Sequence, residues 1–147
     1  WIINYVVVII IVIIGFVFAI VDKRYELVHA TKNIVSYLDK CESKDIKIYT
    51  DYSDGSYFEY YGYKPYLDSR AEVFLKKMNG KEDILKEYID FNINIKTRDK
   101  FIKKYDFDYY LISSLNFDLI NYLINYDDID YEIVYVDKNV YLIKKVS

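Results

Sequence analysis

The sequence has little of the residue types from which self-contained catalytic and metal sites are usually built. It holds one cysteine, one proline, one histidine and four glycines in 147 residues. A lone Cys41 excludes a disulfide within the chain, and a lone His29 excludes a metal site built on several histidine and cysteine ligands. No glycine-rich phosphate loop is present. We therefore expect no catalytic residue and no metal ligand in this segment.

Arginine is also scarce, with 3 arginines against 17 lysines, so few side chains can bind phosphate or carboxylate through two parallel hydrogen bonds. The 20 basic and 23 acidic residues give a net charge of −3. A nucleic-acid-binding protein would need a basic surface patch. Nucleic acid is therefore not an expected partner.

Charged residues are absent from the first 21 residues, WIINYVVVIIIVIIGFVFAIV. As a helix this run would be roughly 30 Å long, which is the thickness of a bilayer core. Trp1 and Tyr5 lie near one end, where interfacial aromatic residues belong, and charges at residues 22–24 end the run. A cleaved signal peptide fits poorly, because no basic segment precedes the run and no Ala-x-Ala site follows it. The sequence predicts a transmembrane helix, with a buried soluble helix as the alternative.

The chain begins with Trp1 rather than methionine. We therefore expect a piece of a longer membrane protein, in which the apolar run is the last span and a missing N-terminal membrane region is a partner. The predicted organisation is a transmembrane helix at residues 1–21, a connecting helix at 22–45 that continues from it, and a soluble α/β domain at 46–147.

Hydrophobic periodicity places strands between helices in the remainder of the chain. The expected order is a helix around residues 27–38, a strand at 46–50, a short helix after Ser53 or Asp54, a strand at 64–68, helices at 81–91 and from Thr97, a strand at 109–113, a helix after Asn116 and a hairpin around residues 137–139. The predicted fold class is α/β, with an N-terminal transmembrane helix, a small, largely parallel sheet, flanking helices and a C-terminal β-hairpin.

The stretch at residues 51–72, DYSDGSYFEYYGYKPYLDSRAE, departs most from the bias of the sequence towards Ile, Lys, Tyr and Asn. It contains Gly55, Gly62, the only proline, Pro65, and one of the three arginines. We expect these glycines and the proline to serve the backbone. Gly62 suits the left-handed position after a short helix, and Pro65 suits the start of a strand.

Four charged side chains in this stretch follow two predicted strands. Asp51 and Asp54 follow the first strand, and Asp68 and Arg70 follow the second. If a right-handed crossover joins these strands in parallel, all four groups emerge at one sheet edge, where sites collect in open α/β sheets. They would then bind a sugar, a divalent cation or a metal–pyrophosphate pair. Structural roles are the alternative, with Asp54 as a helix cap and Asp68 paired to Arg70.

Tyrosines surround the same segment, and 19 are present in the chain. Tyr57 is the aromatic candidate for stacking against a sugar ring. Core packing with an exposed hydroxyl group is the commoner role of such residues. The ligand-binding candidates are therefore Asp51, Asp54, Tyr57, Asp68 and Arg70.

Residues 62–74 have the pattern G-x-K-P-Y-x-D-x-R-x-E-x-F. The chain also contains the DYSDG turn, a helix-to-strand step with the sequence YDFDYYLI and the closing VYVDKNVYLIKK hairpin. Together, over residues 31–147, they resemble the C-terminal soluble domain of bacterial polytopic membrane glycosyltransferases of the GT-C architecture. Many relatives carry W-G-G where this chain has Ser53-Asp54-Gly55, so the resemblance transfers only positions 51, 55, 68 and 70 as candidates.

The resemblance implies an accessory extracytoplasmic domain at the cell membrane that assists binding of a polyprenyl-linked sugar or its acceptor. The catalytic acid would lie in the N-terminal membrane region, so this segment would not be catalytic alone. No cofactor is expected in the segment, and a divalent cation is compatible with the parent protein. Lysines and Arg24 after the run favour a cytoplasmic domain instead. A single-span, membrane-tethered binding or sensing module, unrelated to sugar transfer, is the alternative function.

Overall fold

A computed structural model describes residues 2–137 and 139–146, without the side chains of residues 2–5, 19–29 and 71. In chain order the elements are α1 (Ile2–Cys41), β1 (Lys47–Tyr49), α2 (Gly55–Tyr60), β2 (Lys64–Pro65), the 3-10 helix η1 (Ala71–Phe74), α3 (Lys76–Asn79), α4 (Ile84–Ile93), α5 (Ile95–Tyr105), β3 (Tyr109–Ser113), α6 (Phe117–Ile124), β4 (Tyr131–Val136) and β5 (Val140–Lys145).

The strands form one sheet in the order β2-β1-β3-β5-β4. Strand β1 is parallel to β2 and β3, whereas β5 is antiparallel to β3 and β4. The predicted α/β class and C-terminal hairpin are confirmed. The described sheet is mixed rather than largely parallel, because the hairpin inserts β5 beside β3 and so contributes two antiparallel pairings.

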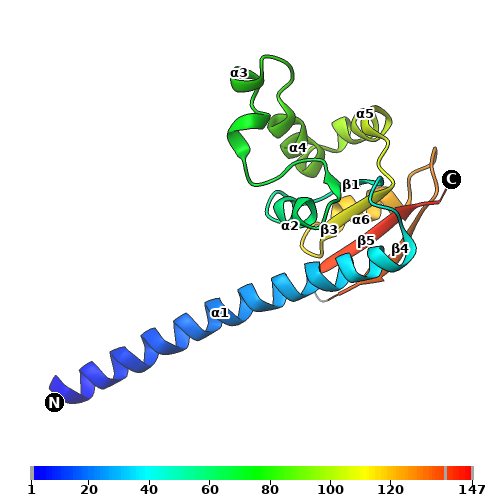
Figure 1. The fold of residues 1–147 in the computed structure, drawn as a ribbon. Helices are drawn as coiled ribbons and strands as arrows, with labels where there is room; N and C mark the ends of the chain where they lie inside the picture. Colours follow the sequence, from blue (N-terminus) through cyan, green and yellow to red (C-terminus); the bar gives the residue numbers. More distant parts are fainter. Residues whose placement is uncertain (1, 138, 147) are drawn as a thin grey trace.

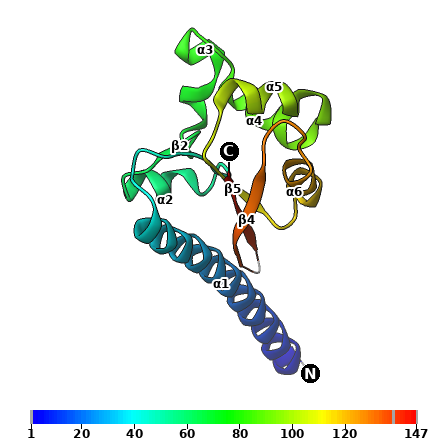
Figure 2. The same ribbon diagram turned by 90° about the vertical axis from the view of Figure 1, so that its right-hand side faces the viewer.

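Helices cover both faces of the sheet, as the two ribbon views show (Figures 1 and 2). Successive strand residues point to opposite faces. On β1, Ile48 packs in the cluster beneath α1 and α2, and Tyr49 packs in the aromatic cluster beneath α4, α5 and α6. On β3, Leu111 packs in the first cluster and Ile112 packs in the aromatic cluster. The sheet therefore has a core on each face.

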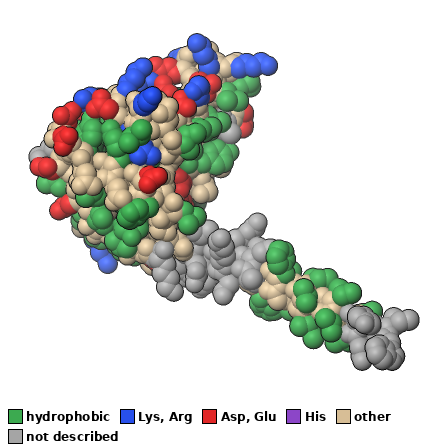
Figure 3. Space-filling model, turned by 180° about the vertical axis from the view of Figure 1, so that it is seen from behind, with side chains coloured by type: hydrophobic (Ala, Val, Ile, Leu, Met, Phe, Trp, Pro, Cys, Tyr) green, Lys and Arg blue, Asp and Glu red, His purple; other side chains and the backbone are tan. Residues whose placement is uncertain are grey.

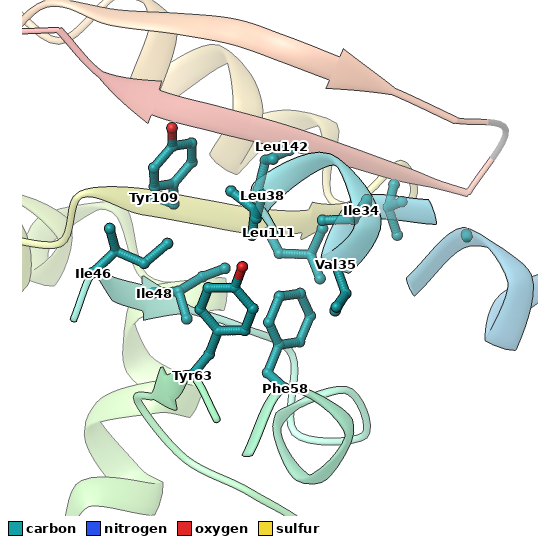
Figure 4. Packing of buried hydrophobic residues seen from close by; sticks show 12 residues of the cluster. Ile34, Val35, Leu38, Ile46, Ile48, Phe58, Tyr63, Tyr109, Leu111 and Leu142 are labelled. Atoms are coloured by element: carbon teal, nitrogen blue, oxygen red, sulfur yellow. The ribbon is translucent and has the colours of Figure 1, made fainter. Parts of the chain in front are cut away.

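The C-terminal part of α1 belongs to the first of these cores. Ala30, Ile34, Val35 and Leu38 recur at helical spacing and are at most 3% exposed. Figure 4 shows three of them directed at Ile48, Leu111 and neighbouring residues. The domain thus holds the end of α1 as part of its own core.

The remainder of α1 continues away from the domain. The apolar run and the residues after it form one continuous helix, which ends at Cys41 and not at residue 45. The large apolar side chains of residues 6–18 are 48% to 69% exposed. Among the residues whose side chains are described, no helix combines the length and apolarity of a membrane span. The predicted span at residues 1–21 lies partly outside those residues, and its boundaries stay a prediction.

Several local predictions can be compared with the backbone. Gly62 has φ +85°, which confirms its left-handed position after α2. Thr97 does not cap a helix: α5 begins at Ile95, and the side chain of Asn94 accepts the capping hydrogen bond from the Lys96 N–H. The short helices η1 and α3 were not expected from the sequence.

Candidate functional site

The segments that follow β1 and β2 lie side by side at the carboxyl edge of the parallel strands. The Tyr52 hydroxyl donates to the Ser69 carbonyl oxygen at 2.5 Å, and the hydroxyl oxygens of Ser56 and Ser69 are 2.8 Å apart. Strands β1 and β2 are parallel, with Ile48 opposite Pro65. The predicted convergence of these two segments at one edge is therefore present.

Gly55 makes this close approach possible. A Cβ atom at this position would lie 1.9 Å from the Leu67 carbonyl oxygen and 2.9 Å from the Asp68 Cα. Both contacts are with backbone, which cannot rotate away as a side chain can. The backbone role expected for Gly55 thus has a specific physical cause, which is the contact between the start of α2 and the end of the β2 segment.

Asp51 and Asp54 lie in the segment that follows β1, and both are half-buried. The Asp51 carboxylate accepts a hydrogen bond from the Tyr88 hydroxyl at 2.9 Å, and the Asp54 carboxylate accepts one from the Thr31 hydroxyl at 3.0 Å. Asp54 stands at the N-cap position of α2, but its side chain makes no cap hydrogen bond. The carboxylate instead accepts the hydrogen bond from Thr31, so Asp54 connects α1 to the segment that follows β1.

The electrostatics of these two carboxylates are unusual for surface acids. Burial raises the pKa of Asp51, and burial together with the nearby Asp51 charge raises the pKa of Asp54. Within the described part of the chain, neither carboxylate forms an ion pair with a lysine or arginine. Among the side chains that the structure describes, no cation compensates these two acceptors at the edge.

Polar residues from α4 and the β3–α6 loop extend the site across the sheet. The Asn92 side chain donates to the Tyr49 hydroxyl at 2.6 Å and accepts from the Asn116 side chain at 2.9 Å. Between Tyr49 and Asp51 in the chain, the hydroxyl of Thr50 is fully buried and has no hydrogen-bond partner among the described residues. Since unpaired buried hydroxyl groups are rare, Thr50 marks unused hydrogen-bonding capacity next to Asp51.

Asp68 and Arg70 form an ion pair with each other, and Arg70 also pairs with Glu59 of α2. The Asp68 carboxylate, which is 6% exposed, accepts from the Arg70 backbone N–H at 2.8 Å and from its Nε at 2.9 Å. The Arg70 guanidinium also reaches Glu59 of α2 at 3.1 Å. The Arg70 guanidinium lowers the pKa of Asp68, and Asp68 raises that of Arg70. This geometry favours the structural alternative for the pair.

The side chain of Tyr57 contacts another tyrosine. Its ring packs at 4.9 Å from that of Tyr61, one turn further along α2. The contact between the two hydroxyl groups, at 3.4 Å, together with partial burial, raises the pKa of Tyr57 to about 12. The binding roles of Tyr57 and of the four charged candidates stay predictions, and the structure places only Asp51 and Asp54 at the end of β1.

The carboxyl edge of β1 lies where the order of the strands reverses direction. From β1 the chain passes to β2 on one side, and β3 lies on the other side of β1. In open α/β sheets, the carboxyl ends of strands at such a reversal are where ligands bind. Ser113 ends β3 at this edge, and Asn116 follows it immediately before α6. Thr31, Tyr88 and Asn92 were missed because they come from distant helices without any local motif.

Three surface hollows lie away from Asp51 and Asp54. One of about 380 Å³ lies between α4 and α5 and includes Glu87 and Lys104, and others of about 330 Å³ and 240 Å³ lie beside α6 and near Glu42. The described side chains contain no group of three or more histidine, cysteine or acidic residues that would hold a metal. What the edge offers is hydrogen-bond acceptors, namely the half-buried carboxylates of Asp51 and Asp54.

Comparison with protein-family models, with curated proteins and with solved structures finds no match to this chain.

Proposed function

We propose that this chain is the accessory, membrane-anchored domain of a glycosyltransferase-like protein, and that the carboxyl edge of its sheet assists binding of a lipid-linked sugar or its acceptor. One observation carries the proposal. Helix α1 runs without a break from the apolar run into the core of the domain. The domain is therefore held in a fixed orientation relative to that run.

Contacts along α1 define this orientation. Near its C-terminal end, Glu42 accepts from the Tyr109 hydroxyl at 2.5 Å, and Tyr109 begins β3. Eleven residues earlier in the chain, Thr31 contacts Asp54 after the end of β1. Helix α1 thus crosses the sheet antiparallel to β1 and β3, and the residues before Thr31 extend beyond the carboxyl edge (Figure 1).

The distances suit a ligand at a membrane surface. If residues 1–21 span the bilayer, residues 22–29 provide about 12 Å of helix before the domain begins. Each headgroup layer is about 5–8 Å thick. Asp51 and Asp54 would then lie close to the headgroups, where the sugar of a lipid-linked donor is presented. Carboxylates that form no ion pair with any described lysine or arginine are suitable acceptors for sugar hydroxyl groups.

The domain would contribute binding rather than chemistry. The described residues around Asp51 include no histidine and no cysteine, so the proposal leaves the catalytic acid to the N-terminal membrane region, as the family resemblance implies. The resemblance also supports an extracytoplasmic position for the domain. Residues 22–29 and the domain would then lie on the side where the lipid-linked donor is consumed.

Binding of a short-chain polyprenyl-phosphate sugar to the full chain in nanodiscs tests this proposal. Asp51→Asn preserves the shape of the side chain and removes its charge, and we expect it to weaken binding on the order of tenfold, as for the loss of a charged hydrogen bond. Asp99→Asn is the matched control, because Asp99 is exposed and pairs with Lys103. Equal affinities of the two variants would refute a role for Asp51.

Two further outcomes separate the competing functions. Asp68→Asn should lower the unfolding temperature and leave sugar binding unchanged, because its carboxylate is already engaged by Arg70. If the unaltered chain is embedded in the nanodisc and binds no sugar lipid, the proposal fails in favour of a membrane-tethered module with a different ligand.

A further inference from the structure

Exposed apolar side chains gather on three connections at the carboxyl edge. Ile93 and Ile95, at the α4–α5 turn, are 76% and 62% exposed. Leu115 and Phe117, at the β3–α6 connection, are 93% and 60% exposed, and Val136, at the hairpin, is 56% exposed. These five residues are called the apolar rim below.

Hydrogen bonds place the three connections next to one another. The Asn116 side chain donates to that of Asn92 at 2.9 Å, which joins the β3–α6 connection to the end of α4. The Ser114 N–H donates to the Asn139 carbonyl oxygen at 2.9 Å, which joins the same connection to the hairpin. The apolar rim is therefore one surface, assembled from segments far apart in the sequence.

This surface faces the same direction as the exposed part of α1. Ser113 at the end of β3 pairs with Val140 at the start of β5, so the hairpin turn also lies at the carboxyl edge. Helix α1 leaves the domain past this edge, and Figure 3 shows its apolar side chains extending beyond the domain. An apolar helix and an apolar rim thus point to the same side of the molecule.

We propose that the apolar rim is a second membrane contact, which enters the interfacial layer of the same bilayer face from which α1 emerges. This inference rests on the proposed anchoring by α1. A bilayer is the occupant that the geometry favours, because α1 leads directly to it and because the rim side chains are 56% to 93% exposed on the tips of three connections. Apolar tips of this kind bury in the headgroup boundary.

Basic residues next to the rim support a lipid partner. Lys96 follows Ile95 directly, and Lys32 lies beside Thr31 on α1; both are exposed. Among the described residues, neither ammonium group makes an ion pair. Both are therefore available to anionic headgroups. With the rim inserted, the edge that carries Asp51 would be held against the headgroups.

Site-specific fluorescence in vesicles tests this inference on the full chain. Cys41, which is exposed, is replaced by serine, and single cysteines at Leu115, Phe117, Ile11 or Tyr60 carry an environment-sensitive dye. Tyr60 is the control, because it is 83% exposed and lies at the C-terminal end of α2, near the amino edge. The vesicles contain phosphatidylcholine and phosphatidylglycerol, with nitroxide lipids as quenchers. Unfolding transitions verify that every labelled variant is folded.

The inference predicts that a shallow nitroxide quenches the dye at Leu115 and Phe117 severalfold more than at Tyr60, and that a deep nitroxide quenches it at Ile11. Quenching at Ile11 with equal signals at the rim and at Tyr60 would overturn the inference and leave the anchor intact. Absence of quenching at Ile11 would overturn both. Rim dyes shielded from aqueous iodide but untouched by lipid nitroxides would identify a protein occupant and also overturn it.

Discussion

Substitution of Gly55 by alanine separates a steric from a conformational requirement. In a helix interior, glycine is about 1 kcal/mol less favourable than alanine. Gly55 is the first residue of α2, so the substitution alone should stabilise this helix by at most about 1 kcal/mol. The added Cβ, however, would lie 1.9 Å from the Leu67 carbonyl oxygen. Since real Cβ atoms do not approach this closely, the segment after β2 must move away from α2.

The magnitude follows from the contacts that this movement breaks. Overpacking of this kind costs about 1–3 kcal/mol. The hydrogen bonds of Ser69 to Tyr52 and to Ser56 lie at the contact, and each is worth about 1 kcal/mol. After subtraction of the gain in helix propensity, we expect Gly55→Ala to lower the free energy of unfolding by about 2–4 kcal/mol. That is a large share of the 5–15 kcal/mol typical of a folded domain.

Urea unfolding of the full chain in detergent micelles, followed by circular dichroism, measures this loss. Gly15→Ala is the matched control, because a Cβ there meets nothing within 4 Å inside helix α1. Gly62→Ala isolates the backbone effect, because its Cβ is also unobstructed but its φ is +85°, which costs about 1–2 kcal/mol. If Gly55→Ala is as harmless as Gly15→Ala, the close approach described above is wrong.

The remaining predictions concern charge. Arg98 is 4% exposed and donates to the carbonyl oxygens of Phe91, Asn92 and Asp118, so Arg98→Ala should cost about 2–4 kcal/mol in thermal unfolding, and Arg98→Lys should restore only part of it. The folded-state pKa of Asp68 is lowered, so its contribution is present above the ordinary value of 3.8 and is lost as the pH falls below it. Asp68→Asn should therefore cost about 1–2 kcal/mol at pH 7, and the difference from the unaltered chain should shrink on acidification. The pKa of Asp51 is raised instead, so the folded state holds its proton more tightly, and stability falls as the pH rises above 3.8. The free energy of unfolding of Asp51→Asn, measured relative to that of the unaltered chain, should thus be higher at pH 7 than at pH 3.5. A change in the opposite direction would contradict the burial argument.

Local sequence patterns were sufficient for much of the sheet. The run of residues 109–113 predicted β3 with the bounds observed, because a continuous apolar stretch at this position has one simple explanation, a buried strand. The turn at Gly62 was also predictable, since a glycine after a short helix relieves the left-handed strain. The helices within residues 71–79 were not, because they are short and lack apolar periodicity.

The site was predictable only in part. Parallel β1 and β2 joined by α2 bring the segments after both strands to one edge, which is a consequence of topology. The partners of the carboxylates are different, because Thr31 and Tyr88 reach them from α1 and α4 through tertiary packing. The same packing explains why Asp54 binds Thr31 rather than capping α2. No spacing rule in the sequence connects residues 23 or 37 positions apart.

Alkaline carbonate extraction of the full chain from cell membranes tests the central claim most directly, because every proposal above depends on α1 as an anchor. The account predicts that the chain stays in the membrane pellet, and that lysines in place of Ile10 and Ile14 release it to the supernatant. Release of the unaltered chain would contradict the account.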